Sequence, residues 1–202
     1  MDMAELLLRG KAEPEAYAQT LSADDIASLI PLLQVKDDAL RYAAFLTLCA
    51  RSDMAPDVMP YWKTFEKKLT DENSYQRSIS LMLIAHNARW DTDGRFGGAF
   101  DRYMACCNDE SFVTRRQAIQ SIKLWAPYAR EHLTAAAKIL MAIDVTVCKE
   151  TQRKLLLQDI CAALVFMAGL TPGLDASAYL QQAITGGILD KKTAKRLLNA
   201  LP

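Results

Sequence analysis

Apolar residues recur along most of this chain at intervals of three and four, the spacing that places them on one face of an α-helix. We find no convincing run of alternating β-branched residues, and 8 Gly with 7 Pro are too few for a many-turned β-sandwich. The longest apolar run, residues 161–170, has ten residues. Crossing a bilayer takes roughly 20, so this run predicts a buried helix segment. The pattern indicates an all-α protein.

Four of the helical segments align on an arginine, at positions 41, 77, 115 and 153, with spacings of 36, 38 and 38 residues. The residues three, four and seven places after each arginine share one side of a helix with it, and almost all of them are apolar. They are Ala44, Phe45 and Leu48; Ser80, Leu81 and Ile84; Ala118, Ile119 and Ile122; Leu156, Leu157 and Ile160. We therefore predict four copies of one repeat with the same buried stripe.

Second helices are predicted between these copies, at residues 56–69, 95–107 and 128–142. An earlier pair is predicted at 14–21 and 23–33, where Pro14 suits a first turn and Ser22 with Asp25 resembles a cap. A closing pair is predicted at 175–185 and 191–200, with Asp190 as the cap of the last helix. Stacked pairs of this size predict a right-handed α-solenoid of about five helix pairs. We expect one domain over 1–202, divided into an N-terminal pair (1–36), a repeat body (37–168) and a closing pair (174–202).

An aspartate precedes the repeat arginine by six residues in two copies, as Asp71 before Arg77 and Asp109 before Arg115. This spacing resembles HEAT repeats, in which such residues form a ladder between neighbouring repeats. The first and fourth copies have valine at that place, Val35 and Val147.

Several strings between residues 57 and 164 resemble an uncharacterised family of bacterial HEAT-like proteins, some of them labelled "SufBD protein". The most similar are Asn87-Ala-Arg89-Trp90-Asp91 and Thr114-Arg115-Arg116-Gln117. The resemblance covers about half of the chain and implies the fold. It implies no iron–sulfur chemistry, and the cysteines here give that label no support.

Charge and cysteine content exclude several classes of function. The 24 basic residues balance the 24 acidic ones, whereas proteins of duplex DNA usually carry a basic excess. The acidic N-terminus lacks the pattern of a signal peptide, and we expect a cytoplasmic protein with no membrane partner. The five cysteines form no metal-ligand pattern and suit small buried positions; only Cys106 and Cys107 are near enough for a redox or metal role. We predict no cofactor and no metal.

The densest polar cluster is His86-Asn87-Ala-Arg89-Trp90-Asp91-Thr-Asp93-Gly94. In a functional interpretation His86 is a base, Asp91 or Asp93 an acid, and Trp90 a stacking surface. In a structural interpretation, which we favour, Trp90 fills the gap between helix pairs and the aspartates form a turn that caps the next helix.

A second candidate is a strip along the inner wall of the predicted solenoid. If the stripe faces the core, the residues one, five and nine places after each arginine face away from it, where solenoids hold extended partners. The candidate partner-binding residues of this strip are Tyr42, Ser78, Met82, His86, Arg116, Gln120, Lys154 and Gln158. The side chains of the strip change from aromatic and apolar at its N-terminal end to cationic and amide-bearing at its C-terminal end. Such a surface suits a peptide with an acidic part and an apolar part. The alternative is that the strip is merely solvated.

The pattern contains no catalytic constellation, so we predict a non-catalytic scaffold that binds a protein or peptide. The alternative is a DNA-binding or DNA-repair enzyme that resembles the bacterial alkylation-repair glycosylases, with Trp62, Trp90, Trp125 and Asp91 as its candidate residues. Residues 1–36 carry a net charge of −3 and residues 148–202 a net charge of +3, which predicts weak head-to-tail contact between copies. We do not expect nucleic acid as the partner.

Overall fold

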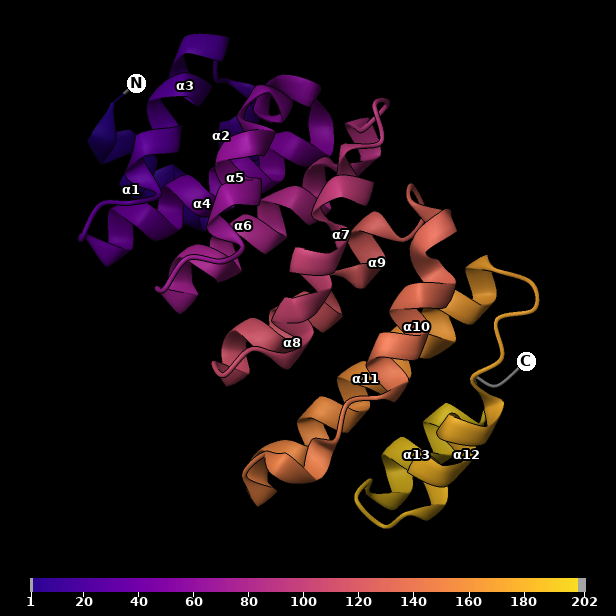
Figure 1. The fold of residues 1–202 in the computed structure, drawn as a ribbon. Coiled ribbons are helices and arrows are strands. Elements are labelled where there is room, and N and C mark those ends of the chain that lie inside the picture. The colour runs from indigo at the N-terminus through magenta and orange to yellow at the C-terminus, as the bar shows by residue number, and fades with distance from the viewer. Residues whose placement is uncertain (1, 200–202) are drawn as a thin grey trace. The chain divides into compact units, whose positions relative to one another are not determined.

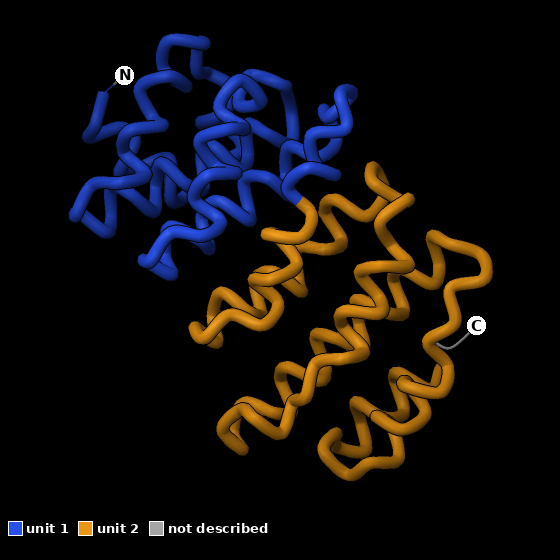
Figure 2. The backbone as a smooth tube through the Cα atoms, in the orientation of Figure 1, with its two compact units in different colours: residues 1–99 blue, residues 100–202 orange. Residues whose placement is uncertain are grey.

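The computed structural model describes residues 2–199, and its secondary structure over that range consists of α-helices and short 3-10 turns without a strand (Figure 1). The all-α prediction is confirmed. The chain divides into two compact units, residues 1–99 and 100–202 (Figure 2). Each is described by itself below, and the expectation of a single repeat domain stays a prediction.

Unit 1 is organised around a long central helix, α4 (Asp38–Met54), which contacts α1, α2, α3 and α6. Its capping signals lie where the pattern predicts them: Pro14 begins a helix, and Ser22 and Asp25 form a capping box. The Ser22 hydroxyl lowers the pKa of the Asp25 carboxyl to about 2. The other elements are α1 (Met3–Ala12), α2 (Pro14–Gln19), α3 (Ala23–Leu32), η1 (Pro56–Tyr61), α5 (Trp62–Lys68), α6 (Ser74–Asn87), η2 (Ala88–Trp90) and the start of α7 (Arg95–Ala105).

Unit 2 is organised in the same way around α11 (Glu150–Leu170), which contacts α8, α9, α10, α12 and α13. The third aligned helix is divided at Ser121, whose hydroxyl donates to the carbonyl of Ala118 and bonds the hydroxyl of Tyr103. The other elements are η3 (Cys106–Asn108), α8 (Phe112–Gln120), α9 (Ile122–Trp125), η4 (Arg130–His132), α10 (Leu133–Met141), η5 (Val145–Val147), α12 (Ser177–Thr185) and α13 (Lys191–Leu198).

The predicted buried stripe is confirmed. The residues three and seven places after the arginines are all buried, and so are three of the four residues at the fourth place. The exception is Phe45, which is half-buried because it lies beside the exposed ring of Tyr42, with 6.3 Å between ring centroids. Asp190 caps α13 as predicted, by accepting from the backbone N–H of Thr193. The helix α1 was not predicted, and residues 200–202 of the predicted last helix lie outside the described range.

In all four copies the guanidinium of the repeat arginine donates to a backbone carbonyl of the preceding loop. In each copy the guanidinium donates to a carbonyl five or six residues earlier, over 2.7–3.1 Å: Arg41 to Val35, Arg77 to Asp71, Arg115 to Asp109 and Arg153 to Cys148. Any residue supplies a carbonyl, so valine at position 35 serves as well as aspartate. The Asp71 and Asp109 carboxylates accept backbone N–H groups two residues on, at Asn73 and Ser111, and the ladder between repeats stays a prediction.

A close approach between α1 and α4 requires glycine at position 10. A Cβ there would lie 2.8 Å from Thr47 Oγ1 and 2.9 Å from Leu6 Cδ1. The Thr47 hydroxyl is buried and donates to the carbonyl of Ala43, so it has little freedom to move.

Because of this contact, Gly10→Ala is expected to lower the free energy of unfolding by about 1–2 kcal/mol, the usual cost of overpacking. The matched change Gly169→Ala, in α11 with open space around the added Cβ, is expected to raise it by about 0.5 kcal/mol through helix propensity. Urea titrations followed by circular dichroism at 222 nm measure both, and equal effects of the two changes would contradict the packing of α1.

Candidate functional site

In unit 2 the last two residues of the predicted strip contact the start of α13 (Lys191–Leu198). Lys154 forms an ion pair with Asp190, and Gln158 donates to Thr193 Oγ1 over 2.8 Å. Both partners belong to the start of α13, and the Lys154 hydrogen bond lowers the pKa of the Asp190 carboxyl. These two residues therefore help to hold the closing helix against α11. Lys154 is exposed as predicted, with 46% of its side chain accessible, whereas Gln158 is half-buried and its expected exposure is wrong.

The strip residues of unit 1 differ among themselves. Ser78 is buried and Met82 is half-buried, so their expected exposure is wrong. His86 is also half-buried, and its Nδ1 lies 2.9 Å from Asp53 Oδ1. Only Tyr42 is exposed as predicted, with 49% of its surface accessible. The expected exposure is wrong here because α6 is contacted by helices on more than one side. A residue that faces away from one neighbouring helix therefore faces another.

Arg116 and Gln120 of α8 both donate hydrogen bonds to the carboxylate of Asp159 in α11. Arg116 Nε lies 2.5 Å from Asp159 Oδ2, and Gln120 Nε2 donates to Asp159 Oδ1 over 2.9 Å. The hydrogen bond to Asp159 raises the pKa of the Arg116 guanidinium. The two residues that we expected to face a partner thus satisfy both oxygens of Asp159, and this network fixes α8 beside α11.

Next to this network the same two helices leave an open hollow of about 380 Å³. We call it the α8–α11 hollow; its lining residues are Ile119, Gln120, Lys123, Asp159, Ala162, Ala163 and Phe166. The small side chains of Ala162 and Ala163 leave the space, and the ring of Phe166 stays 38% exposed beside it. Within the described chain Lys123 is exposed and forms no ion pair. The hollow is thus apolar with one available cation.

Sequence reasoning found Gln120 but missed Lys123, Ala162 and Phe166 as members of one site. Part of the signal lies in the sequence, since Ala162 is nine places after Arg153, one of the positions expected to face away from the core. Phe166 lies thirteen places after its arginine, beyond the part of the repeat that could be aligned. A hollow also depends on which side chains are small in two helices at once, and a single periodicity does not show that.

The polar cluster at residues 86–94 joins the ends of α6 and α4, and Asn87 is its most buried member. Asn87 is 1% exposed, and its amide donates to Ser52 Oγ and to the carbonyl of Leu83, both over 2.8 Å. The indole N–H of Trp90 donates to the carbonyl of Ser52 over 2.6 Å. The end of α6 is therefore tied to the end of α4.

The charged residues of the cluster link α6 to α4 a second time, at Asp53. Arg89 donates to the carbonyl of Asp53 over 2.7 Å and pairs with its carboxylate at 3.1 Å, the same carboxylate that contacts His86. Asp91 accepts from the backbone N–H groups of Arg95 and Phe96 and so caps α7, as predicted. These contacts support the structural interpretation of the cluster.

Burial suppresses the chemistry of the cysteines. Cys49, Cys106, Cys107 and Cys161 are buried. Burial raises the pKa of the Cys107 and Cys49 thiols, and raises that of Cys161 to about 11. Because the thiolate is the reactive form, these residues suit packing rather than nucleophilic chemistry. Among residues 2–199 no group of three His, Cys, Asp or Glu side chains could hold a metal ion.

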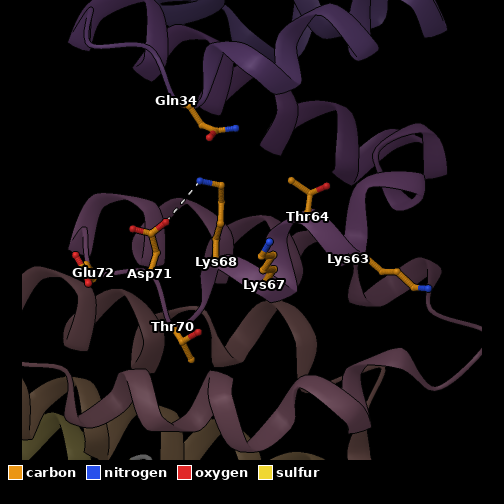
Figure 3. Close-up of a pocket in the computed structure, with 8 residues that line it drawn as sticks. All are labelled: Gln34, Lys63, Thr64, Lys67, Lys68, Thr70, Asp71 and Glu72. Carbon is orange, nitrogen blue, oxygen red and sulfur yellow. Dashed lines mark ion pairs between the residues drawn. The ribbon is translucent and has the colours of Figure 1, made fainter.

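Unit 1 carries a second concave site that the sequence analysis missed, shown in Figure 3. We call it the lysine pocket; its lining residues are Gln34, Lys63, Thr64, Lys67, Lys68, Thr70, Asp71 and Glu72. The spacing of Lys63, Lys67 and Lys68 in α5 was a usable signal, since residues four apart lie on one side of a helix. The contribution of Gln34 comes from a distant turn and required the fold.

Comparisons with protein-family models, with curated proteins and with solved structures gave no match. Over the described residues, no helix combines the length and the apolar character that crossing a membrane requires. The site geometry therefore carries the functional argument.

Proposed function

We propose that this chain is a non-catalytic binding protein that holds a protein or peptide segment in the α8–α11 hollow. The segment carries an apolar side chain next to a carboxylate. The apolar side chain enters the space above Ala162 and packs on Phe166, and the carboxylate pairs with Lys123. We place the protein in the cytoplasm, where its free cysteines remain reduced.

One observation carries this proposal: the hollow is apolar, yet its only available charge is positive. Asp159 lies in the lining, but Arg116 and Gln120 already occupy its oxygens. Lys123 has no such partner among the described residues. A volume of about 380 Å³ lies within the range of about 300–1,000 Å³ typical of ligand sites, which gives room for a few side chains.

A HEAT-like solenoid is the architecture that we propose for the scaffold. In its favour, the four aligned helices bury equivalent positions and their arginines make equivalent bonds to the preceding loop. Successive copies also touch within each unit, α4 with α6 and α8 with α11. The likeness to the bacterial "SufBD protein" family belongs to the same proposal.

The four residues that suggested the DNA-repair alternative are buried or engaged in contacts within the protein. Trp62 and Trp125 are 1% and 0% exposed, so neither ring is available to stack on a base. Trp90 is half-buried and uses its N–H on α4, while Asp91 caps α7. None of these side chains lies free in a groove.

A peptide panel tests the proposed function. We expect fluorescence polarisation to show that short peptides with leucine or phenylalanine next to an acidic residue bind the full chain about tenfold more tightly than peptides lacking either part. Lys123→Glu is expected to weaken binding at least tenfold, which corresponds to about 1.4 kcal/mol. Ala162→Trp, which fills the hollow, is expected to weaken it as much.

The matched control is Lys138→Glu, which reverses another exposed lysine of unit 2 outside the hollow. We expect it to leave affinity within twofold of the wild type. Equal effects of Lys123→Glu and Lys138→Glu, or a panel without preference for the apolar–acidic pair, would contradict the proposal. Tight binding of duplex DNA in the same assay would favour the alternative.

A further inference from the structure

The lysine pocket differs from the α8–α11 hollow in that no apolar residue lines it. All eight side chains around its volume of about 820 Å³ are charged or carry a hydroxyl or an amide (Figure 3). No aromatic ring lines the pocket, so a base has nothing on which to stack, and the apolar surface comes only from the stems of polar side chains. A ligand that fits this lining has charge and hydrogen-bond acceptors over most of its own surface.

Lys68 is held in place at the centre of the pocket. Its ammonium donates to Gln76 Oε1 over 2.9 Å and lies 3.7 Å from Asp71 Oδ2. Gln76 is itself buried, and its amide donates to the carbonyl of Leu33 over 2.8 Å. This chain of hydrogen bonds fixes one cation before a ligand arrives and links it to the turn that carries Gln34.

Lys63 and Lys67 supply positive charge that the protein does not neutralise. Both are exposed, and among residues 2–199 neither has an ion-pair or hydrogen-bond partner. Figure 3 shows Lys67 beside Lys68, with Lys63 at one end of the pocket and its side chain extending away from the other two lysines. Thr64 and Gln34 lie opposite one another, and their side chains make no hydrogen bond within the described residues. Cations and neutral donors therefore surround one open space.

One of the two acidic residues, Asp71, lies beside Lys68 (Figure 3). Asp71 is engaged by Lys68 and by the backbone N–H of Asn73. Glu72 lies at the end of the pocket opposite Lys63 (Figure 3). Its carbonyl accepts from the guanidinium of Arg77 over 3.0 Å, which adds a positive charge at that end.

From this geometry we infer that the lysine pocket binds a small anion that carries two or more phosphoryl groups and no apolar part. Phosphoryl oxygens accept several hydrogen bonds each and gain from ammonium groups as point charges. The volume of about 820 Å³ accommodates more than one such group, with Lys67 and Lys68 at the first and Lys63 at the end of the pocket, from which its flexible side chain can reach the second. This site lies in unit 1, so it is independent of the peptide hollow in unit 2.

Isothermal titration calorimetry of the full chain with sodium pyrophosphate tests this inference. We expect one site per chain, with sulfate at matched ionic strength binding at least tenfold more weakly. Lys63→Gln combined with Lys67→Gln is expected to weaken pyrophosphate binding at least tenfold. Thr64→Val combined with Thr70→Val is expected to weaken it about threefold, because a formed site uses hydroxyls and diffuse attraction does not.

Lys138→Gln combined with Lys149→Gln removes two exposed lysines of unit 2 and is the matched control, with an expected change below twofold. The inference is overturned if pyrophosphate gives no saturable heat at millimolar concentration, if sulfate binds equally well, or if both double-lysine variants lose the same affinity. Circular dichroism verifies that each variant keeps its helix content. Peptide binding by the same variants is expected to be unchanged, which separates this site from the proposed function.

Discussion

Replacing Trp125 by alanine is expected to lower the free energy of unfolding by about 3–5 kcal/mol, the range for deleting a fully buried large aromatic side chain. Trp125 is 0% exposed, at the end of α9. Its ring meets Phe100 and Tyr103 edge-on, at centroid distances of 6.3 and 6.2 Å. Removing it leaves a cavity and takes away two aromatic contacts together.

Urea unfolding followed by circular dichroism at 222 nm measures this loss. Trp125→Phe keeps one ring in place and is expected to cost about half as much, because part of the edge contact survives. Val147→Ala, at a residue of unit 2 that is 73% exposed, is expected to change stability by less than about 0.5 kcal/mol. A Trp125→Ala loss as small as the Val147→Ala loss would show that Trp125 is free to act as a surface group, as the DNA-repair alternative requires.

The second large effect concerns Asn87. Asn87→Asp is expected to cost about 3 kcal/mol at pH 7, because it places a charge in a buried site without a partner. The Asn87 amide faces Leu83 O and Ser52 Oγ. A carboxylate in the same place faces the Leu83 carbonyl with like polarity, and the nearby Arg89 and His86 are already engaged by Asp53.

This loss should depend on pH in a defined direction. Burial raises the pKa of the introduced carboxyl in the folded state above its unfolded value of about 4. Such a group costs little below the unfolded pKa, and stability is lost as the pH rises through the folded pKa. We therefore expect the deficit of Asn87→Asp to grow between about pH 4.5 and pH 8.

Asn73→Asp, at the other end of α6, is the matched control for this prediction. Asn73 is exposed and caps the helix, and aspartate caps as well as asparagine does, so we expect a change below about 0.5 kcal/mol. Thermal unfolding at several pH values compares the two variants. A pH-independent loss equal for both would contradict the buried tie between α6 and α4.

The helices and their buried faces could be predicted because they depend on local periodicity. The stripe after each arginine is set by spacing alone, and Leu48, Ile84, Ile122 and Ile160 are all buried. Local capping chemistry was predictable for the same reason, as at Ser22 and Asp190.

The orientation of the other helix faces could not be predicted, because it depends on which helices meet. Gln158 faces Thr193 and Arg116 faces Asp159, partners that are 35 and 43 residues away in the chain. The arginine spacing is visible in the sequence, but the hydrogen bonds from these arginines to backbone carbonyls required coordinates, since a backbone carbonyl leaves no mark in the sequence. The two concave sites could not be predicted for the same reason. Ala162 lines the α8–α11 hollow and Gln34 lines the lysine pocket only because other helices lie beside them.

Taken together, the contacts give most of the conspicuous polar residues a role in holding helices together. Two sites of different chemistry remain available, an apolar hollow with one cation in unit 2 and a cationic pocket lined by charged and polar residues in unit 1. Their difference makes the proposals separable, because a ligand suited to one lining lacks what the other offers.

The central claim is that a peptide segment enters the α8–α11 hollow, and amide chemical-shift mapping tests it most directly. A ¹⁵N-labelled chain is titrated with the tightest apolar–acidic peptide of the panel. We predict that the largest shifts fall on Lys123, Ala162, Ala163 and Phe166, with little change at Lys63 and Lys67. Shifts concentrated elsewhere, or absent at saturating peptide, would contradict the account.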